Sequence, residues 1–215
     1  TTPASPVGSA DNPTTNVIKV VNNWVGEAAK ELKIRLSNVN IKVGNSVDKA
    51  AMDVSGDGTT KVELDGQNVL DSYSVRYQAG LRKQGEGTLI ITDETNNEGK
   101  KITTPKSESD TSGSLTAKGA GGNGAAGIGG SAAEGTKNII IEGYATVHAA
   151  GGDWGAGIGG GGSGAKVDKR RADLGGKGAH RLAVGGKRGV ADAGPVKLAH
   201  RHGGGKDAHC AVAAG

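Results

Sequence analysis

The chain has 215 residues, of which 40 are glycine and none is phenylalanine. This composition argues against a bulky globular core and leaves room for a thin core of Val, Ile, Leu and Ala. The formal net charge is +4 and there is a single cysteine, so an internal disulfide is excluded, and no apolar run is long enough for a membrane-spanning helix.

The N-terminal part of the chain differs in composition from the sequence that follows it. Residues 1–15 are rich in Thr, Ser, Pro and Asn and predict a flexible linker, as though a leader or a preceding segment had been removed. Residues 16–31 are expected to form an N-terminal cap, with a helical turn at 25–31. A solenoid needs such a cap because its open end exposes unpaired strand edges.

From residue 32 onward the local pattern is that of short strands. Apolar and polar residues alternate with period two in 32–36, 39–43 and 61–64, which places one face of each segment inside and one outside. The runs 89–91 and 139–141 consist of Leu and Ile, and the β-branched residue Ile favours strands. Turn pairs such as Asp-Gly and Glu-Gly separate these segments. We therefore expect about three short strands in each turn of the chain.

A repeat indicates how these strands are stacked. Residues 125–130 (AAGIGG) return as residues 155–160 (GAGIGG), thirty positions later. A fixed period of this length is typical of a solenoid, in which each unit buries its apolar face against a neighbour. Leu81, Ile128 and Ile158 are expected to line up in one internal column. The glycines beside them are expected to permit tight corners or a close approach of neighbouring coils.

The same comparison predicts the register of the other strands. A shift of 28 positions places Leu36 on Leu64 and Asn40 on Asn68. A shift of 77 places Leu64 on Ile141 and Ala79 on Ala156, and a shift of 30 places Leu115 on Ala145. Parallel stacking of equivalent strands in this register predicts a parallel β-helix.

Four coils follow from this register, over residues 32–54, 61–83, 88–130 and 138–160. The third coil is longer than the others by about twenty residues, because a polar segment rich in Gly and Ser lies between Thr92 and Leu115. A polar segment of this composition predicts a surface loop. The expected fold is therefore all-β, a right-handed parallel β-helix of about four coils over residues 32–165.

Residues 166–215 form a basic tail in which the strand signals fade. The tail holds eleven Lys and Arg against four Asp, and four of the five histidines. We expect it to be disordered or poorly formed, because it buries too little apolar surface to offset chain entropy. Three interpretations stay open: an arm for nucleic acids or anionic surfaces, although no interleaved aromatics or nucleic-acid motif support a nucleic acid, a metal site at His200, His202, His209 and Cys210, or a repetitive gene read out of frame.

The order of several motifs resembles a known family. Three motifs follow one another: a strand-like segment with Asp-Gly-x-Asn at 62–70, Ala-Gly-Leu at 79–81, and Gly-rich repeats at 122–130. This order is similar to that of Gly-rich parallel β-helix domains of bacterial secreted and surface proteins, often labelled carbohydrate-binding or pectate-lyase-like. The resemblance covers residues 32–164. It implies an extracellular or cell-surface location, on a fold that serves lyases, adhesins and passive stalks alike.

An exposed aromatic side chain beside polar groups is the usual platform for a sugar ring. Trp154 lies in a Gly-rich turn next to Asp153, and Tyr144 follows a Glu-Gly turn of the same coil. These three residues are the predicted ligand-binding site, with the alternative that Trp154 simply covers the last coil. The predicted function is a non-catalytic carbohydrate-binding or adhesin-like module whose partner is a polysaccharide or cell-surface glycan.

Two other functions stay open. A Ca²⁺-dependent polysaccharide lyase would need clustered carboxylates and a Lys or Arg base. The candidate acids have no spacing that marks a Ca²⁺ site, and no catalytic residue or cofactor is predicted; these acids are Asp53, Asp65, Asp71, Asp93, Glu142 and Asp153. Asp65 and Glu142 are expected at equivalent coil positions, where turn formation explains them. The third possibility is a purely structural stalk.

Overall fold

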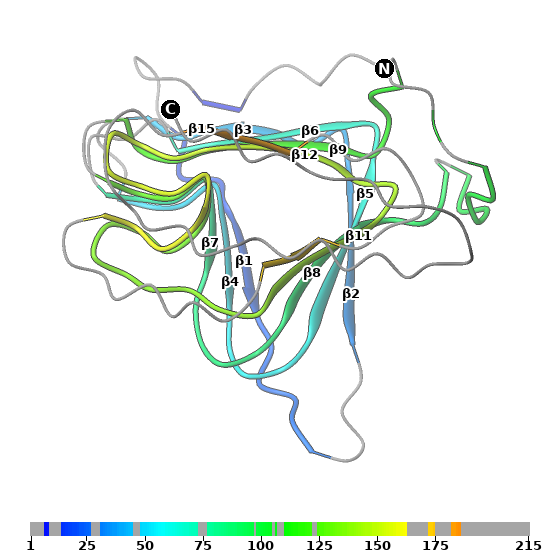
Figure 1. The fold of residues 1–215 in the computed structure, drawn as a ribbon, viewed down its shortest axis with the longest axis horizontal. Helices are drawn as coiled ribbons and strands as arrows, with labels where there is room; N and C mark the ends of the chain where they lie inside the picture. Colours follow the sequence, from blue (N-terminus) through cyan, green and yellow to red (C-terminus); the bar gives the residue numbers. More distant parts are fainter. Residues whose placement is uncertain are drawn as a thin grey trace, which may run out of the picture.

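The computed structural model describes residues 7–8, 14–26, 31–44, 48–72, 77–96, 98–104, 106, 110–121, 124–162, 172–174 and 182–185. This part of the chain is all-β and contains no helix. Its strands form three five-stranded sheets, and every pair of neighbouring strands is parallel. Figure 1 shows the strands of each sheet lying side by side.

The chain visits the three sheets in turn, so that each coil adds one strand to each sheet. Sheet 1 contains β1 (Ile18–Val21), β4 (Met52–Ser55), β7 (Leu81–Lys83), β10 (Ile128–Gly129) and β13 (Ile158–Gly159). Sheet 2 contains β2 (Leu32–Ser37), β5 (Thr60–Asp65), β8 (Leu89–Asp93), β11 (Ile139–Gly143) and β14 (Ala172–Leu174). Sheet 3 contains β3 (Asn40–Lys42), β6 (Gln67–Asp71), β9 (Ser114–Lys118), β12 (Thr146–Ala150) and β15 (Leu182–Gly185).

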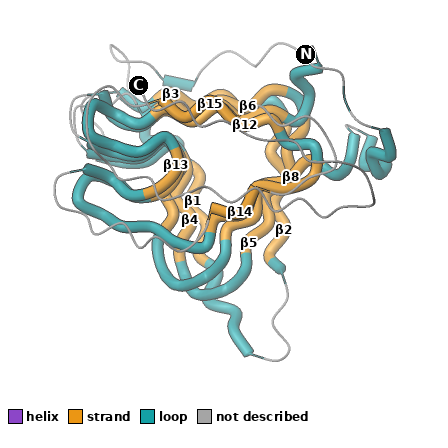
Figure 2. The backbone as a smooth tube through the Cα atoms, viewed as in Figure 1, coloured by secondary structure: helices purple, strands orange, loops and turns teal. Residues whose placement is uncertain are grey.

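The three sheets are the three sides of a stack of coils that surrounds the core (Figure 2). Each of the four expected coils contains one strand of every sheet. β1 precedes the first of them, and β14 and β15 follow the last. The parallel β-solenoid expected from the repeat is confirmed by this strand order.

The internal column of sheet 1 is also confirmed. Ile128 pairs with Leu81 on one side and with Ile158 on the other, and Met52 and Ile18 continue the same row. Met52, Leu81 and Ile128 have no solvent exposure. Burying one such side chain completely contributes about 1.5–3 kcal/mol, so this row is a principal source of stability.

The register of the other two sheets differs in part from the expected one, although the predicted pairing of Leu36 with Leu64 is confirmed. In sheet 2, Val62 pairs with Ile91 and Ile91 with Ile141, a shift of 79 positions rather than 77. In sheet 3, Leu115 pairs with Val147, a shift of 32 rather than 30. Both differences are two residues, so the same faces stay inside, because side chains alternate with period two along a strand.

One pairing is displaced by a single residue. Asn40 pairs with Val69 and not with Asn68, because three residues separate the paired positions Asp65 and Val69, whereas two separate Ser37 and Asn40. At this position the side chain of Asn68 supplies the hydrogen bonds that a regular backbone pairing would otherwise make. Its side-chain Oδ1 accepts a hydrogen bond from the Val39 N–H at 2.9 Å, and its Nδ2 donates to the Asp65 carbonyl at 3.1 Å.

The two positions on either side of Ile128 require glycine for different physical reasons. A Cβ atom on Gly127 would lie 2.7 Å from the Ala150 backbone nitrogen, so the absence of a side chain lets the corner lie against sheet 3. Gly129 has a φ of 130°, and its counterpart Gly159 has a φ of 141°. L-residues rarely adopt this conformation. The repeated Gly-Ile-Gly motif thus combines a close approach with a special backbone geometry.

The ends of the predicted domain contain strands that we did not expect. Residues 16–31, the expected cap, include β1, which pairs with β4 like any other strand of the solenoid. Val7, in the expected linker, forms a parallel bridge to Ile41. β14 and β15 fall within the tail that was expected to be poorly formed. Residues 27–30 and the rest of the tail, including His200, His202, His209 and Cys210, lie outside the described residues.

Truncating Ile128 to alanine should lower the free energy of unfolding by about 2–5 kcal/mol, because a cavity opens between Leu81 and Ile158. Val21→Ala is the control, because the Val21 side chain is 56% exposed, and it should change stability by less than about 0.5 kcal/mol. Urea denaturation followed by far-ultraviolet circular dichroism measures both. Equal, small losses in the two variants would contradict the internal column.

Candidate functional site

One corner of the solenoid is much longer than its neighbours. Between sheets 2 and 3 the chain needs two residues after β2, one after β5 and two after β11. After β8 it needs residues 94–113, which we name the corner insertion. This is the surface loop expected between Thr92 and Leu115. Long loops held by a rigid scaffold often carry function, so this corner is the strongest candidate for a functional site.

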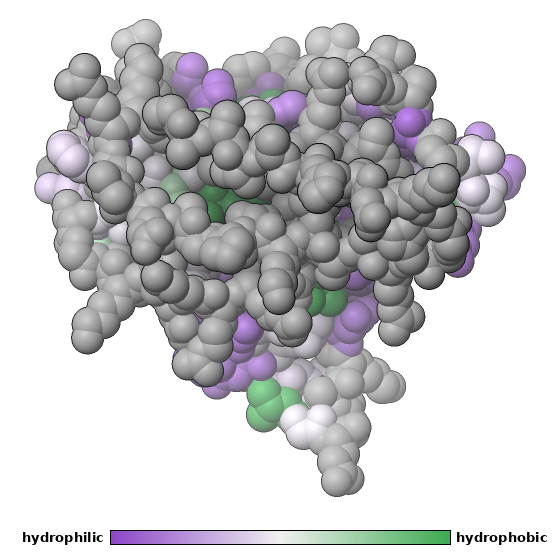
Figure 3. Space-filling model, viewed as in Figure 1, coloured by the Kyte–Doolittle hydropathy of each residue, from purple (hydrophilic) through white to green (hydrophobic). Residues whose placement is uncertain are grey.

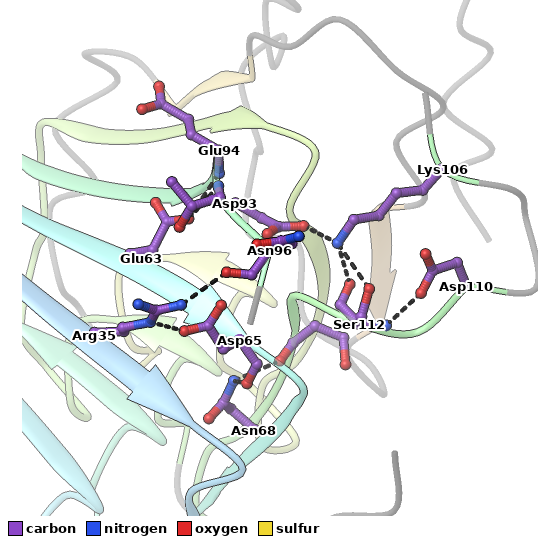
Figure 4. Close-up of polar contacts among 12 residues, drawn as sticks. Arg35, Glu63, Asp65, Asn68, Asp93, Glu94, Asn96, Lys106, Asp110 and Ser112 are labelled. Carbon is purple, nitrogen blue, oxygen red and sulfur yellow. Dashed lines mark hydrogen bonds and ion pairs between the residues drawn. The ribbon is translucent and has the colours of Figure 1, made fainter. Parts of the chain in front are cut away.

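The start of the corner insertion is fixed by side chains of the two preceding coils. The Glu63 carboxylate oxygen Oε1 accepts hydrogen bonds from the Glu94 N–H at 2.9 Å, and from the Thr95 N–H at 2.7 Å and hydroxyl at 2.8 Å. Arg35 Nη2 donates to the Asn96 carbonyl at 2.8 Å. Arg35 and Glu63 are neighbours in sheet 2, so this sheet presents a ready attachment for the insertion (Figure 4).

The end of the corner insertion is held by Lys106. Its Nζ donates to the Asp93 carboxylate, to the Ser112 carbonyl at 2.8 Å and to the Ser112 hydroxyl at 2.9 Å. Figure 4 shows Lys106 reaching across to these groups from the far side of the insertion. Asp110 accepts a hydrogen bond from the Ser112 N–H at 2.9 Å, and the hydrogen bonds from Ser112 lower the pKa of Asp110.

A pocket of about 440 Å³ lies between the corner insertion and the coils below it. Buried Asp65 and Asp93 form its floor, whereas Lys101, Thr103 and Thr104 are exposed and form its rim. The lining residues are mostly charged or carry a hydroxyl group: Asp65, Asp93, Thr95, Asn96, Lys101, Ile102, Thr103, Thr104, Lys106, Asp110, Ser112 and Gly113. The chemistry of this lining suits a polar ligand.

Asp93 is buried because of its place in the sheet. Glu63 pairs with Thr92, so the next residue, Asp93, continues the inward row of Leu36 and Leu64. Its side chain is 1% exposed. Burial raises the pKa of Asp93 from 3.8 to about 6, although Lys106 acts in the opposite direction. The nearby charges of Glu63 and Asp65 add to the increase in this pKa.

The geometry around Asp93 also depends on a glycine. Gly113 has a φ of 67°, and a Cβ atom on it would collide with the Asp93 carboxylate. Any other residue at this position would be strained and would displace the carboxylate from the pocket floor. Gly113 therefore allows the insertion to close directly over Asp93.

Asp65 is buried for a different reason. Asp65 pairs with Ser37 and follows the inward-facing Leu64, so its side chain lies on the outward face of sheet 2. The side chain is nevertheless only 2% exposed, because the corner insertion lies over it. Its Oδ2 accepts a hydrogen bond from Arg35 Nε. Its Oδ1 is buried and has no hydrogen-bond partner among the described residues. A buried acceptor in this state is destabilising until a donor reaches it.

The predicted site residues are not brought together at this pocket. Asp153 and Trp154 lie in the corner between β12 and β13, where both are exposed, Trp154 to 57%. Tyr144 lies at the opposite end of β12, half-buried, and its N–H donates to the Asp93 carbonyl at 2.8 Å. β12 alone spans about 16 Å. Trp154 with Asp153 therefore stays a candidate platform, and Tyr144 belongs to the corner that carries the pocket.

The expected equivalence of Asp65 and Glu142 is wrong. Glu142 pairs with Thr92 and Thr92 with Glu63, so Glu142 shares the row of Glu63. Its carboxylate lies 3.1 Å from Lys61 Nζ, which also contacts Glu94 at 3.2 Å. Within the part of the chain that the structure describes, no group of three or more His, Cys, Asp or Glu side chains is placed to hold a metal ion.

The raised pKa of Asp93 has a measurable consequence for stability. The folded chain binds a proton at Asp93 up to about pH 6, whereas the unfolded chain releases it near the ordinary value of 3.8. The stability that this proton contributes is therefore present below the ordinary pKa and is lost as the pH rises through the folded pKa. The free energy of unfolding of the wild type, relative to Asp93→Asn, should fall between about pH 4 and pH 6.

Urea denaturation at several pH values measures this difference, and carbon-13 NMR of the Asp93 carboxyl gives its midpoint directly. Glu98→Gln is the control, because the Glu98 side chain is 68% exposed. An Asp93 midpoint near the ordinary value, or a pH dependence that Asp93→Asn retains, would contradict the buried position described above.

Comparisons with protein-family models, with curated proteins and with solved structures find no match for this chain. Among the described residues, no helix is long and apolar enough to cross a membrane. The interpretation of the corner pocket therefore depends on the chemistry of the residues that line it.

Proposed function

We propose that this chain is a non-catalytic carbohydrate-binding module, built on a right-handed parallel β-helix. The single observation that carries the proposal is the corner pocket, in which two buried carboxylates lie below a rim of hydroxyl groups and a lysine. The right-handed sense follows from the strong preference of parallel crossover connections. The motif order that resembles Gly-rich β-helix domains of bacterial secreted proteins supports an extracellular or cell-surface location.

The chemistry of the pocket suits a sugar. A sugar ring presents several hydroxyl groups that donate and accept hydrogen bonds. Carboxylates are strong acceptors for such groups, and charge-assisted hydrogen bonds are about twice as strong as neutral ones. Asp65 Oδ1, which has no hydrogen-bond partner among the described residues, can accept a hydrogen bond from a sugar hydroxyl group. Thr103, Thr104 and Lys101 supply further donors at the rim.

A polymer would reach beyond the pocket. Sheet 3 joins the corner that carries the pocket to the corner that carries Trp154. The side chains that point outward along β12 are short or polar, namely Thr146, His148 and Ala150. A polysaccharide lying along this face would contact the pocket and could stack on Trp154 at the far corner. Weak contacts at the two corners would then add up to useful affinity.

Asp65→Asn should weaken glycan binding by about tenfold or more, because the pocket then loses a charged acceptor and the partner of Arg35. Trp154→Ala should weaken the binding of long oligosaccharides and leave that of short ones unchanged. Glycan arrays followed by isothermal titration calorimetry measure both effects, with Glu98→Gln as the control on the same insertion. Circular dichroism checks that each variant is folded.

Two results would contradict the binding proposal. Glycan binding that Asp65→Asn leaves intact would remove the pocket from the function. Silence on the arrays, with no effect of either substitution in any binding assay, would favour a purely structural stalk.

A second candidate function is favoured by the carboxyl pair itself. Asp93, with a pKa of about 6, can hold a proton near neutral pH, whereas Asp65 lies beside it in contact with a guanidinium group. A protonated acid next to a carboxylate is the arrangement that glycosidases use, and a carboxylate with a neighbouring lysine occurs in lyases. The alternative is therefore an enzyme that cleaves a polysaccharide.

Enzymatic cleavage is tested by incubating the chain with pectin, alginate and neutral polysaccharides near pH 6, with and without Ca²⁺. New reducing ends reveal hydrolysis, and ultraviolet absorbance of unsaturated products reveals elimination. We expect neither product. Products that Asp93→Asn abolishes and Glu98→Gln does not would replace the binding proposal with the enzyme.

A further inference from the structure

The lining of the corner pocket has more negative than positive groups. It contains three carboxyl groups, those of Asp65, Asp93 and Asp110, and two lysines, Lys101 and Lys106. Arg35 does not line the pocket and contacts Asp65 from sheet 2. Arg35 is also 44% exposed at its side chain, so water screens part of its charge. At the rim, Lys101 is balanced by Asp110. A ligand with one positive charge would compensate the excess.

The floor also lacks a hydrogen-bond donor. Asp65 Oδ1 is buried and unpartnered among the described residues, and Asp65 lines the pocket. The described part of the chain places no group of three or more His, Cys, Asp or Glu side chains that could hold a metal ion. An ammonium group needs no such cage. It carries three donors and a full positive charge, so it satisfies both requirements at once.

The other lining residues indicate what carries this ammonium group. Hydroxyl side chains surround the floor, from Thr95, Thr103, Thr104 and Ser112. They suit a polyhydroxylated ring rather than an aliphatic chain, because each can exchange hydrogen bonds with a ring hydroxyl. The pocket volume of about 440 Å³ is sufficient for a single sugar unit with room for the bond to its neighbours.

We propose that the corner pocket selects a saccharide unit that carries a free, protonated primary amine, that is, an amino sugar without its acetyl group. The amine donates to Asp65 Oδ1 and faces Asp93, and the ring hydroxyls contact the hydroxyl side chains of the insertion. This inference depends on the proposed carbohydrate-binding function and names the class of sugar for the same pocket.

The test uses three tetrasaccharides with the same β-1,4 linkage that differ only at carbon 2. They are the tetramers of glucosamine, of N-acetylglucosamine and of glucose, which carry an amine, an acetamide and a hydroxyl group. Calorimetry with the whole chain at about pH 6, where most of the sugar amine is protonated although its pKa lies well below that of Lys, should give an affinity for the glucosamine tetramer about tenfold higher than for the other two. Raising the salt concentration should reduce this preference.

Asp65→Asn should abolish the preference, and Glu98→Gln should retain it. Asp93→Asn is the second variant, expected to reduce the preference in the same direction, and it keeps the test decisive if Asp65→Asn does not fold. Tetralysine is the probe for charge alone, and it should bind at least about tenfold more weakly than the glucosamine tetramer.

Each remaining outcome overturns a defined part of the inference. Equal affinities for the three tetramers, or a preference for the acetylated one, would overturn the selection of an amine and leave carbohydrate binding in place. Tight binding of tetralysine would overturn the role of the sugar ring. Absence of binding for all three tetramers and for the wider glycan array would overturn the proposed function as well.

Discussion

The structure depends on the parallel stacking of short strands whose inward side chains occupy the same position in every coil. Ile18, Met52, Leu81, Ile128 and Ile158 form one such row, with successive coils in direct contact. A row of this kind leaves little freedom in the corners that return the chain to the next level. The glycines beside Ile128 follow from this constraint, one for close approach to sheet 3 and one for its positive φ. Many of the glycines in the described residues are thus a consequence of the packing of coils.

The candidate site arises where this regular stacking is interrupted. The inward row of Leu36 and Leu64 continues with Asp93, and the chain leaves the coil directly after it. A carboxyl at this position is unfavourable for stability, as its raised pKa shows. The corner insertion compensates in part by bringing Lys106 to Asp93, although the same insertion buries Asp65. Unfavourable burial of polar groups that a fold tolerates at one place is a common mark of function.

Stacking also explains how residues distant in sequence meet at the pocket. Arg35, Glu63 and Asp93 belong to three successive strands of sheet 2, so their separation in space is the spacing of neighbouring strands. Each coil contributes one group, and the insertion contributes Lys106 from outside (Figure 4). By contrast, the small apolar area at the tip between β1 and β2, seen at the bottom of Figure 3, contains exposed Trp24 and Val25. This area lies apart from the residues that line the pocket.

The amino-acid sequence by itself determined the all-β class, the parallel solenoid, the row of Leu81, Ile128 and Ile158, and the long corner in the third coil. It could do so because the alternation of apolar and polar residues and the repeat near thirty residues can be read directly from the sequence. Only the tertiary structure decided the later pairings of sheets 2 and 3, where corners of unequal length displace Val147 and Ile141 by two residues from the expected pairing. It also decided the site: Arg35, Asp65 and Lys106 carry no shared motif, and they meet because stacked coils and one insertion place them there. The burial that leaves Asp65 without a partner is a property of that packing, which no local pattern contains.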